Sequence, residues 1–123
     1  MPNRDQHLRQ AGTNAKLLAD LQLRGIDYPD WVIVVAFYTA LHAVDGHLDS
    51  RGVHPKKHSE RNSEVARDVS LRAVSPDYLR LYWESRRARY DCSVMGPNDA
   101  QRALQNMYEP VRARLCSLLG VTL

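Results

Sequence analysis

The fold class that this sequence predicts is all-α, an up-and-down bundle of four to five helices. Apolar residues recur at spacings of three and four rather than in alternation, which is the periodicity of helices and not of strands. Proline and glycine stand at the breaks between the apolar stripes, as they do where helices start and stop. With 123 residues, 44% of them hydrophobic and 25% charged, the chain has the size and composition of one soluble domain, residues 1–123.

The first two predicted helices cover residues 4–23 and 29–50. Leucines and alanines form one stripe along the first helix, and Gly25 is expected to end it. A proline suits the first turn of the second helix, and Gly52 follows its end. The segment 31–41 of the second helix is apolar on all sides, so it must be covered by sister helices or by a second subunit.

Three further helices are expected downstream. The third covers residues 58–71. The fourth begins with Ser75 as its cap, has a proline at its first helical position, and runs to about residue 90. Its apolar side holds Tyr78, Leu79, Tyr82 and Trp83. The last helix follows the loop 96–99 and runs up to Gly120, with a kink expected at Pro110.

The sequence points to a cytoplasmic protein that does not enter a membrane. Its longest apolar run, residues 31–41, is far shorter than a bilayer span, and the first residues lack the apolar stretch of a signal peptide. Cys92 and Cys116 are then expected as reduced thiols. Without a CxxC spacing, they argue against a zinc site and against a disulfide framework.

The basic residues are strongly biased, because 14 of the 17 are arginines. A guanidinium holds phosphate or carboxylate through two parallel hydrogen bonds, whereas lysine offers a mobile point charge. The net charge is only +3, so the bias fits either phosphate binding at particular positions or general surface solubility. The positions of the arginines must decide between the two.

Three polar residues interrupt the apolar second helix. His42, Asp45 and Asp49 stand at i, i+3 and i+7, so they share one face. Asp49 is predicted to face solvent. His42 and Asp45 lie where burial is expected, so they either satisfy each other or belong to a binding site. We assign no metal and no cofactor, because two possible ligands on one helix fall short of a metal site.

Imidazoles and guanidiniums gather in the segment 51–62, which joins the second helix to the third. His58 and Arg61 stand at the expected start of the third helix, where free amides and the helix dipole favour an anion. Arg51 and Arg61 can hold a phosphate while His58 moves a proton, which suffices to cleave RNA by 2'-OH attack without a metal. His54 is a second candidate for the proton transfer, although the proline after it favours an extended connector. A solvated basic loop is the competing interpretation.

The end of the fourth predicted helix carries a second basic group. Arg86 and Tyr90 stand four residues apart, so guanidinium and ring can stack, and together with Arg89 they can face RNA. A helix-end charge cluster above an aromatic core explains the same residues equally well. His7 and His47 are predicted to be surface positions.

Several segments together resemble the HEPN superfamily, small α-helical bundles named for nucleotide binding in higher eukaryotes and prokaryotes. Arg51 and His58 have six residues between them, as in the Arg-to-His ribonuclease motif of that family. The wider likeness covers roughly half the chain and comprises Asp30-Trp31, residues 37–42, His54-Pro55, His58 with Arg61, and residues 85–90.

The resemblance implies a homodimer in which two Arg/His motifs form one composite cleft. His58 would be the proton-transfer residue and Arg51 the phosphate holder of a metal-independent endoribonuclease in defence or stress, with an antitoxin as one conceivable partner. Many members of the superfamily have lost nuclease activity, so the alternative is a non-catalytic module that binds nucleotide, RNA or a protein partner. A basic DNA-binding protein ranks third, because the charge is dispersed and no recognition helix stands out.

Overall fold

Helices make up the regular structure of this computed structural model, which describes residues 2–24 and 27–123, and no strand occurs among them. The elements in order are α1 (Arg4–Leu23), α2 (Pro29–Asp49), α3 (His58–Arg67), η1 (Val69–Leu71), α4 (Ser75–Tyr90), α5 (Pro97–Ala103), η2 (Leu104–Tyr108) and α6 (Glu109–Leu119). Because α5, η2 and α6 follow one another without a break, the described residues form five helices. The predicted all-α bundle is confirmed.

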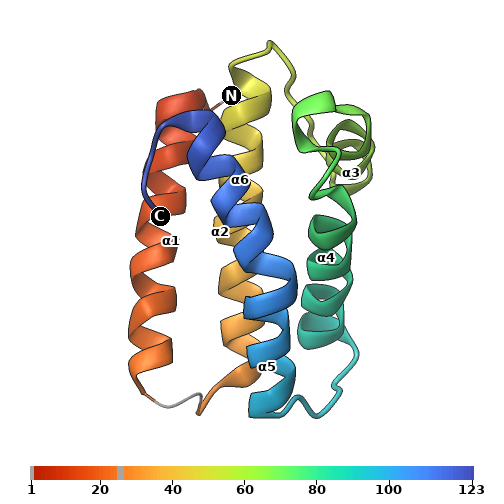
Figure 1. Cartoon of the computed structure of the whole chain (residues 1–123). Helices are drawn as coiled ribbons and strands as arrows, with labels where there is room; N and C mark the ends of the chain where they lie inside the picture. Colours follow the sequence, from red (N-terminus) through yellow and green to blue (C-terminus); the bar gives the residue numbers. More distant parts are fainter. Residues whose placement is uncertain (1, 25–26) are drawn as a thin grey trace.

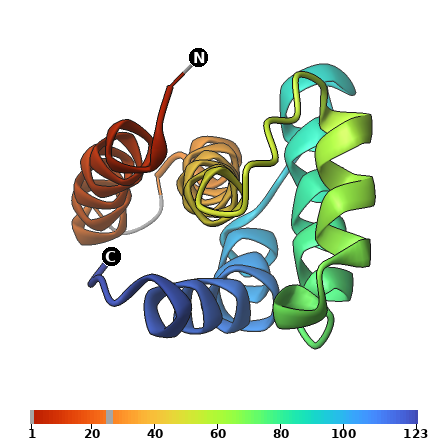
Figure 2. The ribbon, with the colours of Figure 1, turned by 90° about the horizontal axis from the view of Figure 1, so that it is seen from above.

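The bundle is arranged around α2. Seen from above, α1 lies on one side of α2, α4 on the other, and the segment α5–α6 closes a third side (Figure 2). These helices share a common direction, whereas the short α3 lies across it beside α4 (Figure 1). Buried side chains from every helix join one hydrophobic core.

The helix α1 has the predicted bounds because its start carries a clear signal. The Asn3 side chain accepts a hydrogen bond from the Gln6 N–H, and the Gln6 side chain accepts one from the Asn3 N–H. Ala11 and Leu18 of the predicted apolar stripe are buried, and α1 packs chiefly on α2. The stop expected at Gly25 lies outside the described residues.

Sister helices of the same chain bury α2 on nearly all sides. Within the segment 31–41, Trp31 is the one largely exposed residue, at 57%. This segment therefore gives no support for a second subunit, and the homodimer stays a prediction. By length and composition α2 is apolar enough to cross a membrane, but 78% of its most apolar stretch is buried inside the bundle, which makes it weak evidence for a span.

The helix α3 is shorter than predicted, since it ends at Arg67 rather than at Leu71. Asp68 takes an extended conformation (ψ 121°), and its carboxylate accepts the N–H of Ser70. Aspartate competes for nearby backbone donors in this way and stops a helix. The residues that follow form the separate turn η1.

The helix α4 spans the predicted residues, but two details of the prediction are wrong. Ser75 does not cap the helix, because its hydroxyl donates to the Arg72 carbonyl. Trp83 is 60% exposed and does not join the apolar side. Leu81 and Ser85, four residues apart, are buried instead. They lie on the inner side of the helix, and Trp83 lies on its outer flank.

The last helix is disturbed where the proline predicted a kink. The π-helical turn η2 ends two residues before Pro110, which has no N–H to continue the α-helical hydrogen bonds. Gly120 ends the helix in the left-handed conformation (φ 67°), as expected of a glycine stop. Gly52 does the same after α2 (φ 74°), where the Val53 N–H reaches the Leu48 carbonyl at 2.9 Å.

Candidate functional site

A buried ion pair joins α2 to α3. Arg61 Nε donates to Asp45 Oδ1 at 2.7 Å, and Arg61 Nη2 donates to Asp45 Oδ2 at 3.0 Å. Asp45 is 7% exposed and Arg61 8%, so little water reaches either charge and each is stabilised by the other. The bidentate geometry also fixes the start of α3 against the end of α2. Asp45 is thus satisfied by Arg61 of α3 rather than by His42 of its own helix.

His42 faces α1, where it meets His7. The two Nδ1 atoms lie 3.3 Å apart, so at most one of them carries a proton between the rings. Burial, and next the neighbouring His7, lower the pKa of His42 below 6.5. His7 is half-buried in this contact, so its prediction as a surface position is wrong. Its partner lies 35 residues away, and no local spacing could have shown the pair.

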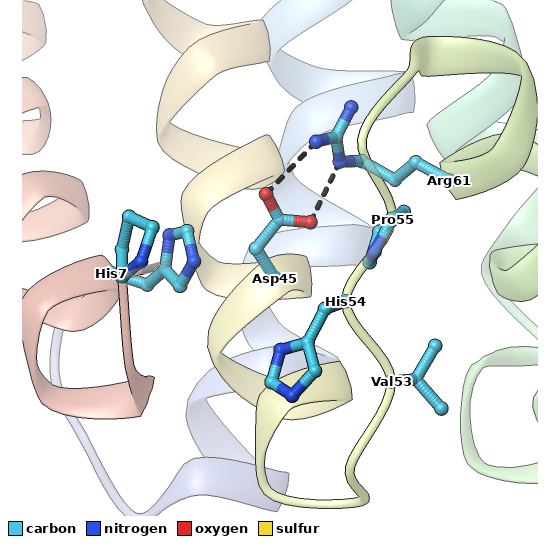
Figure 3. A pocket seen from close by; sticks show the side chains of 7 residues that line it. His7, Asp45, Val53, His54, Pro55 and Arg61 are labelled. Carbon is cyan, nitrogen blue, oxygen red and sulfur yellow. Dashed lines mark hydrogen bonds and ion pairs between the residues drawn. The ribbon is translucent and has the colours of Figure 1, made fainter.

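A cleft of about 200 Å³, which we call the histidine cleft, lies next to the ion pair. It is lined by Pro2, His7, Asp45, Val53, His54, Pro55 and Arg61. Figure 3 shows Arg61 reaching towards Asp45 from α3, with His7 on the α1 side and His54 on the connector. Among residues 2–24 and 27–123, no three His, Cys, Asp or Glu side chains are grouped so that they would hold a metal ion.

Asp49 and His54 are paired with each other at one end of α2. His54 Nδ1 lies 3.2 Å from Asp49 Oδ1, and Asp49 Oδ2 accepts the N–H of Arg4 at 2.7 Å. Asp49 therefore caps the start of α1 and is not the solvent-facing residue that was predicted. His54 does lie in a non-helical connector, as expected, and 40% of its side chain is exposed.

His58 opens α3 and packs on aromatic rings. Its ring centroid lies 5.8 Å from that of Phe37 and 5.4 Å from that of Tyr82. Arg61 Nη1 is 3.5 Å from His58 Nδ1, and a guanidinium can only donate, so this contact favours an unprotonated Nδ1. Burial, followed by the charges of Arg61, Arg89 and Arg86, lowers the pKa of His58 below 6.5. Burial and these charges therefore both favour the neutral imidazole.

The C-terminal turns of α4 add two arginines to the surroundings of His58. Arg89 Nη1 donates to the Tyr38 hydroxyl at 2.7 Å. The Arg86 Cζ lies 5.5 Å from the Tyr90 ring centroid, so the predicted stack of guanidinium on ring is confirmed. The charges of Arg61, Arg89 and Arg86 all act on the imidazole of His58 and lower its pKa.

Arg51 lies elsewhere. Its Nη1 donates to Asp68 Oδ2 at 3.0 Å, and His47 Nε2 lies 3.1 Å from the same oxygen. Burial alone would raise the pKa of Asp68, but the hydrogen bond and charge of His47, the Ser70 N–H and Arg51 outweigh it and lower that pKa. His47 is 7% exposed, so its prediction as a surface position is wrong. Within one chain, the structure brings Arg61 to His58 but pairs Arg51 with Asp68.

Comparison with known proteins adds no relative, since no family model, curated protein or solved structure matches this chain.

The two cysteines are free, Cys92 exposed and Cys116 partly buried. Sequence reasoning missed three members of these clusters: Phe37 and Tyr82 beneath His58, and Tyr38 against Arg89. Tyr38 lies on the same helical face as His42, and that position was the available signal.

Proposed function

We propose that this protein is a metal-independent endoribonuclease of HEPN type, with His58 as its proton-transfer residue. One observation carries the proposal. A half-buried imidazole with a lowered pKa stands among three guanidiniums at the start of a helix. General bases work best when they are unprotonated at the working pH, and arginines stabilise the charge that develops on a phosphate.

The chemistry needs only these groups. His58 takes the proton of a ribose 2'-OH, and the 2'-oxygen attacks the adjacent phosphorus. The bond from phosphorus to the 5'-oxygen breaks, which leaves a 2',3'-cyclic phosphate, and the departing 5'-oxygen takes a proton. The imidazolium formed on His58 in the first step returns a proton to this oxygen through water, which restores the neutral ring. A composite cleft in a homodimer and a role in defence or stress are part of the same proposal.

The phosphate contacts are assigned to Arg86 and Arg89 within one chain. Arg61 is occupied by Asp45, and its guanidinium acts on His58 as a nearby charge. Arg51 has an exposed side chain (52%) but pairs with Asp68, so its contribution to a phosphate at His58 requires the partner subunit of the proposed dimer.

A non-catalytic module that binds RNA, nucleotide or a protein partner is the second candidate. The Asp45–Arg61 pair favours it, because the arginine nearest to His58 is already neutralised by a carboxylate. In that case the same cationic surface holds a phosphate and no proton is transferred.

The test is RNA cleavage in EDTA by purified wild type, His58→Ala and His54→Ala. We expect His58→Ala to lose about 10²- to 10⁴-fold in rate while RNA binding stays nearly unchanged, because a neutral imidazole adds little electrostatic affinity. His54→Ala is the matched control and should retain activity. The products should end in 2',3'-cyclic phosphate.

Arginine variants separate the two candidates further. Arg86→Ala should weaken both binding and cleavage and reduce the salt dependence of binding by about 0.7 of a unit in log–log slope, the value for one single-strand phosphate contact. Wild type that binds RNA but cleaves none in any buffer would overturn the nuclease and leave the binding module. Cleavage by His58→Ala at the wild-type rate would remove His58 from the mechanism.

A further inference from the structure

An exposed aromatic and cationic surface runs along the outer flank of α4. Trp83, Arg86 and Tyr90 stand at i, i+3 and i+7, so they share one side of the helix. Trp83 is 60% exposed and Tyr90 63%. The Arg86 Cζ lies between them, 5.8 Å from the Trp83 ring centroid and 5.5 Å from that of Tyr90. We call these three residues, with Arg89, the Trp83–Tyr90 face.

The arginines of this face differ in their pairing from five other helix arginines. In five places an arginine is paired with a carboxylate three residues earlier: Arg67 with Glu64, Arg80 with Asp77, Arg87 with Glu84, Arg102 with Asp99, and Arg112 with Glu109. Three residues before Arg86 stands Trp83, and three before Arg89 stands Arg86. Across the described parts of the chain, neither of these two guanidiniums is paired with a carboxylate.

Aromatic rings in contact connect this face to His58. The Trp83 ring centroid lies 5.1 Å from that of Tyr82, and Tyr82 lies 5.4 Å from His58. Arg89 extends the face on its other side, with its Cζ 5.0 Å from the Tyr90 ring centroid. One buried ring, Tyr82, therefore separates the exposed Trp83 from the imidazole of His58.

We propose that the Trp83–Tyr90 face is a stacking platform for the unpaired bases of single-stranded RNA, and this inference rests on the proposed function. Exposed indole and phenol rings stack on bases of any sequence, while the adjacent guanidiniums hold the backbone phosphates. A duplex keeps its base faces covered and cannot use such rings. A second copy of this chain on the same face would set the unpaired arginines of both copies against each other, which like-charge repulsion disfavours, so the proposed homodimer is expected to leave these rings open.

Binding is measured apart from cleavage. The probe is a fluorescein-labelled 2'-O-methyl oligouridylate of about 12 nucleotides, whose blocked 2'-oxygens prevent cleavage and whose length suits a single-strand site. Its affinity is read from fluorescence anisotropy for wild type, Trp83→Ala, Tyr90→Ala and Trp83→Phe. The same strand annealed to its complement is the duplex probe. Arg9 is an exposed arginine of α1, on the other side of α2. Arg9→Ala is therefore the matched control for Arg86→Ala, because each variant removes one positive charge.

We expect Trp83→Ala and Tyr90→Ala each to weaken single-strand binding by about tenfold, the usual effect of removing one stacking ring. Trp83→Phe should stay close to wild type, and duplex affinity should not depend on Trp83. Circular dichroism should show both alanine variants folded.

Three results would overturn the platform. They are unchanged single-strand binding by Trp83→Ala, equal wild-type affinity for duplex and single strand, and a change of oligomeric state in Trp83→Ala, which would mean that a second copy covers the face. Failure of the proposed nuclease looks different, because wild type would then bind the blocked strand in a Trp83-dependent way yet leave unmodified RNA intact.

Discussion

The arginines of the histidine cleft and of the Trp83–Tyr90 face differ in burial and in charge pairing. In the cleft, Arg61 is buried and held by both oxygens of Asp45. On the face, Arg86 is exposed and lies between two rings without a carboxylate partner among the described residues. A guanidinium whose charge is already matched stabilises the fold, whereas one left in solvent beside aromatic rings is available to an anionic ligand.

Because of this difference, the arginines proposed to bind a ligand are not those that flank His58 in the sequence. The sequence drew attention to the connector after α2, where Arg51 and Arg61 flank His58. The structure neutralises both, through Asp68 and Asp45. Arg86 and Arg89 of α4 also act on His58, and among the described residues neither is paired with a carboxylate.

Breaking the ion pair of the cleft should have a large effect on stability. Asp45→Ala leaves the Arg61 charge buried and unpaired, so we expect the free energy of unfolding to fall by about 3–5 kcal/mol in urea denaturation. Glu84→Ala, which removes the partner of the exposed Arg87, is the matched control and should cost about 0–1 kcal/mol. Similar losses for the two variants would show that Arg61 is not held as a structural cation.

The two half-buried imidazoles should make stability depend on pH. Burial is the main reason that the pKa values of His42 and His58 lie below 6.5 in the folded chain. The unfolded chain therefore binds protons first as pH falls, so the free energy of unfolding should decrease as pH drops through 6.5 towards the folded pKa values. Asp68, with its pKa lowered from 3.8, loses its ion pairs only below this range.

Histidine ring shifts followed by NMR separate the individual groups. Folded-state midpoints for His42 and His58 should both lie below 6.5. His42→Gln should flatten part of the pH dependence of stability, because one of the two titrating rings is gone. A midpoint at or above the ordinary value for His58 would mean that the arginines of α4 do not act on it, which removes the link between the face and the imidazole.

The smallest effect is expected on the face itself. Trp83→Ala should change the free energy of unfolding by no more than about 0.5 kcal/mol, since a ring that is 60% exposed contributes little. Tyr82→Ala, one residue earlier and buried, should cost about 3–5 kcal/mol. Thermal unfolding of Trp83→Ala and Tyr82→Ala measures the two losses in stability side by side. A loss for Trp83→Ala as large as that for Tyr82→Ala would make Trp83 part of the core and not a platform for ligand.

The sequence by itself determined the features that depend on neighbours along the chain. The start of α1 follows from its capping residues, the stop after α2 from Gly52, and the disturbance in the last helix from Pro110. The contact of Arg86 with Tyr90 was predictable because residues four apart meet on any helix. These features need only the geometry of one helix, which is the same in every fold.

Only the tertiary structure decided which partner each charged side chain takes. Arg61 meets Asp45 across 16 residues of sequence, Arg51 meets Asp68 across 17, and His7 meets His42 across 35. The burial of His47 and the exposure of Trp83 likewise depend on how the helices pack around α2. A long side chain pairs with whatever charge the helix packing brings within its reach, and burial makes that pairing obligatory, so periodicity along the chain shows which residues share a face but not what that face meets.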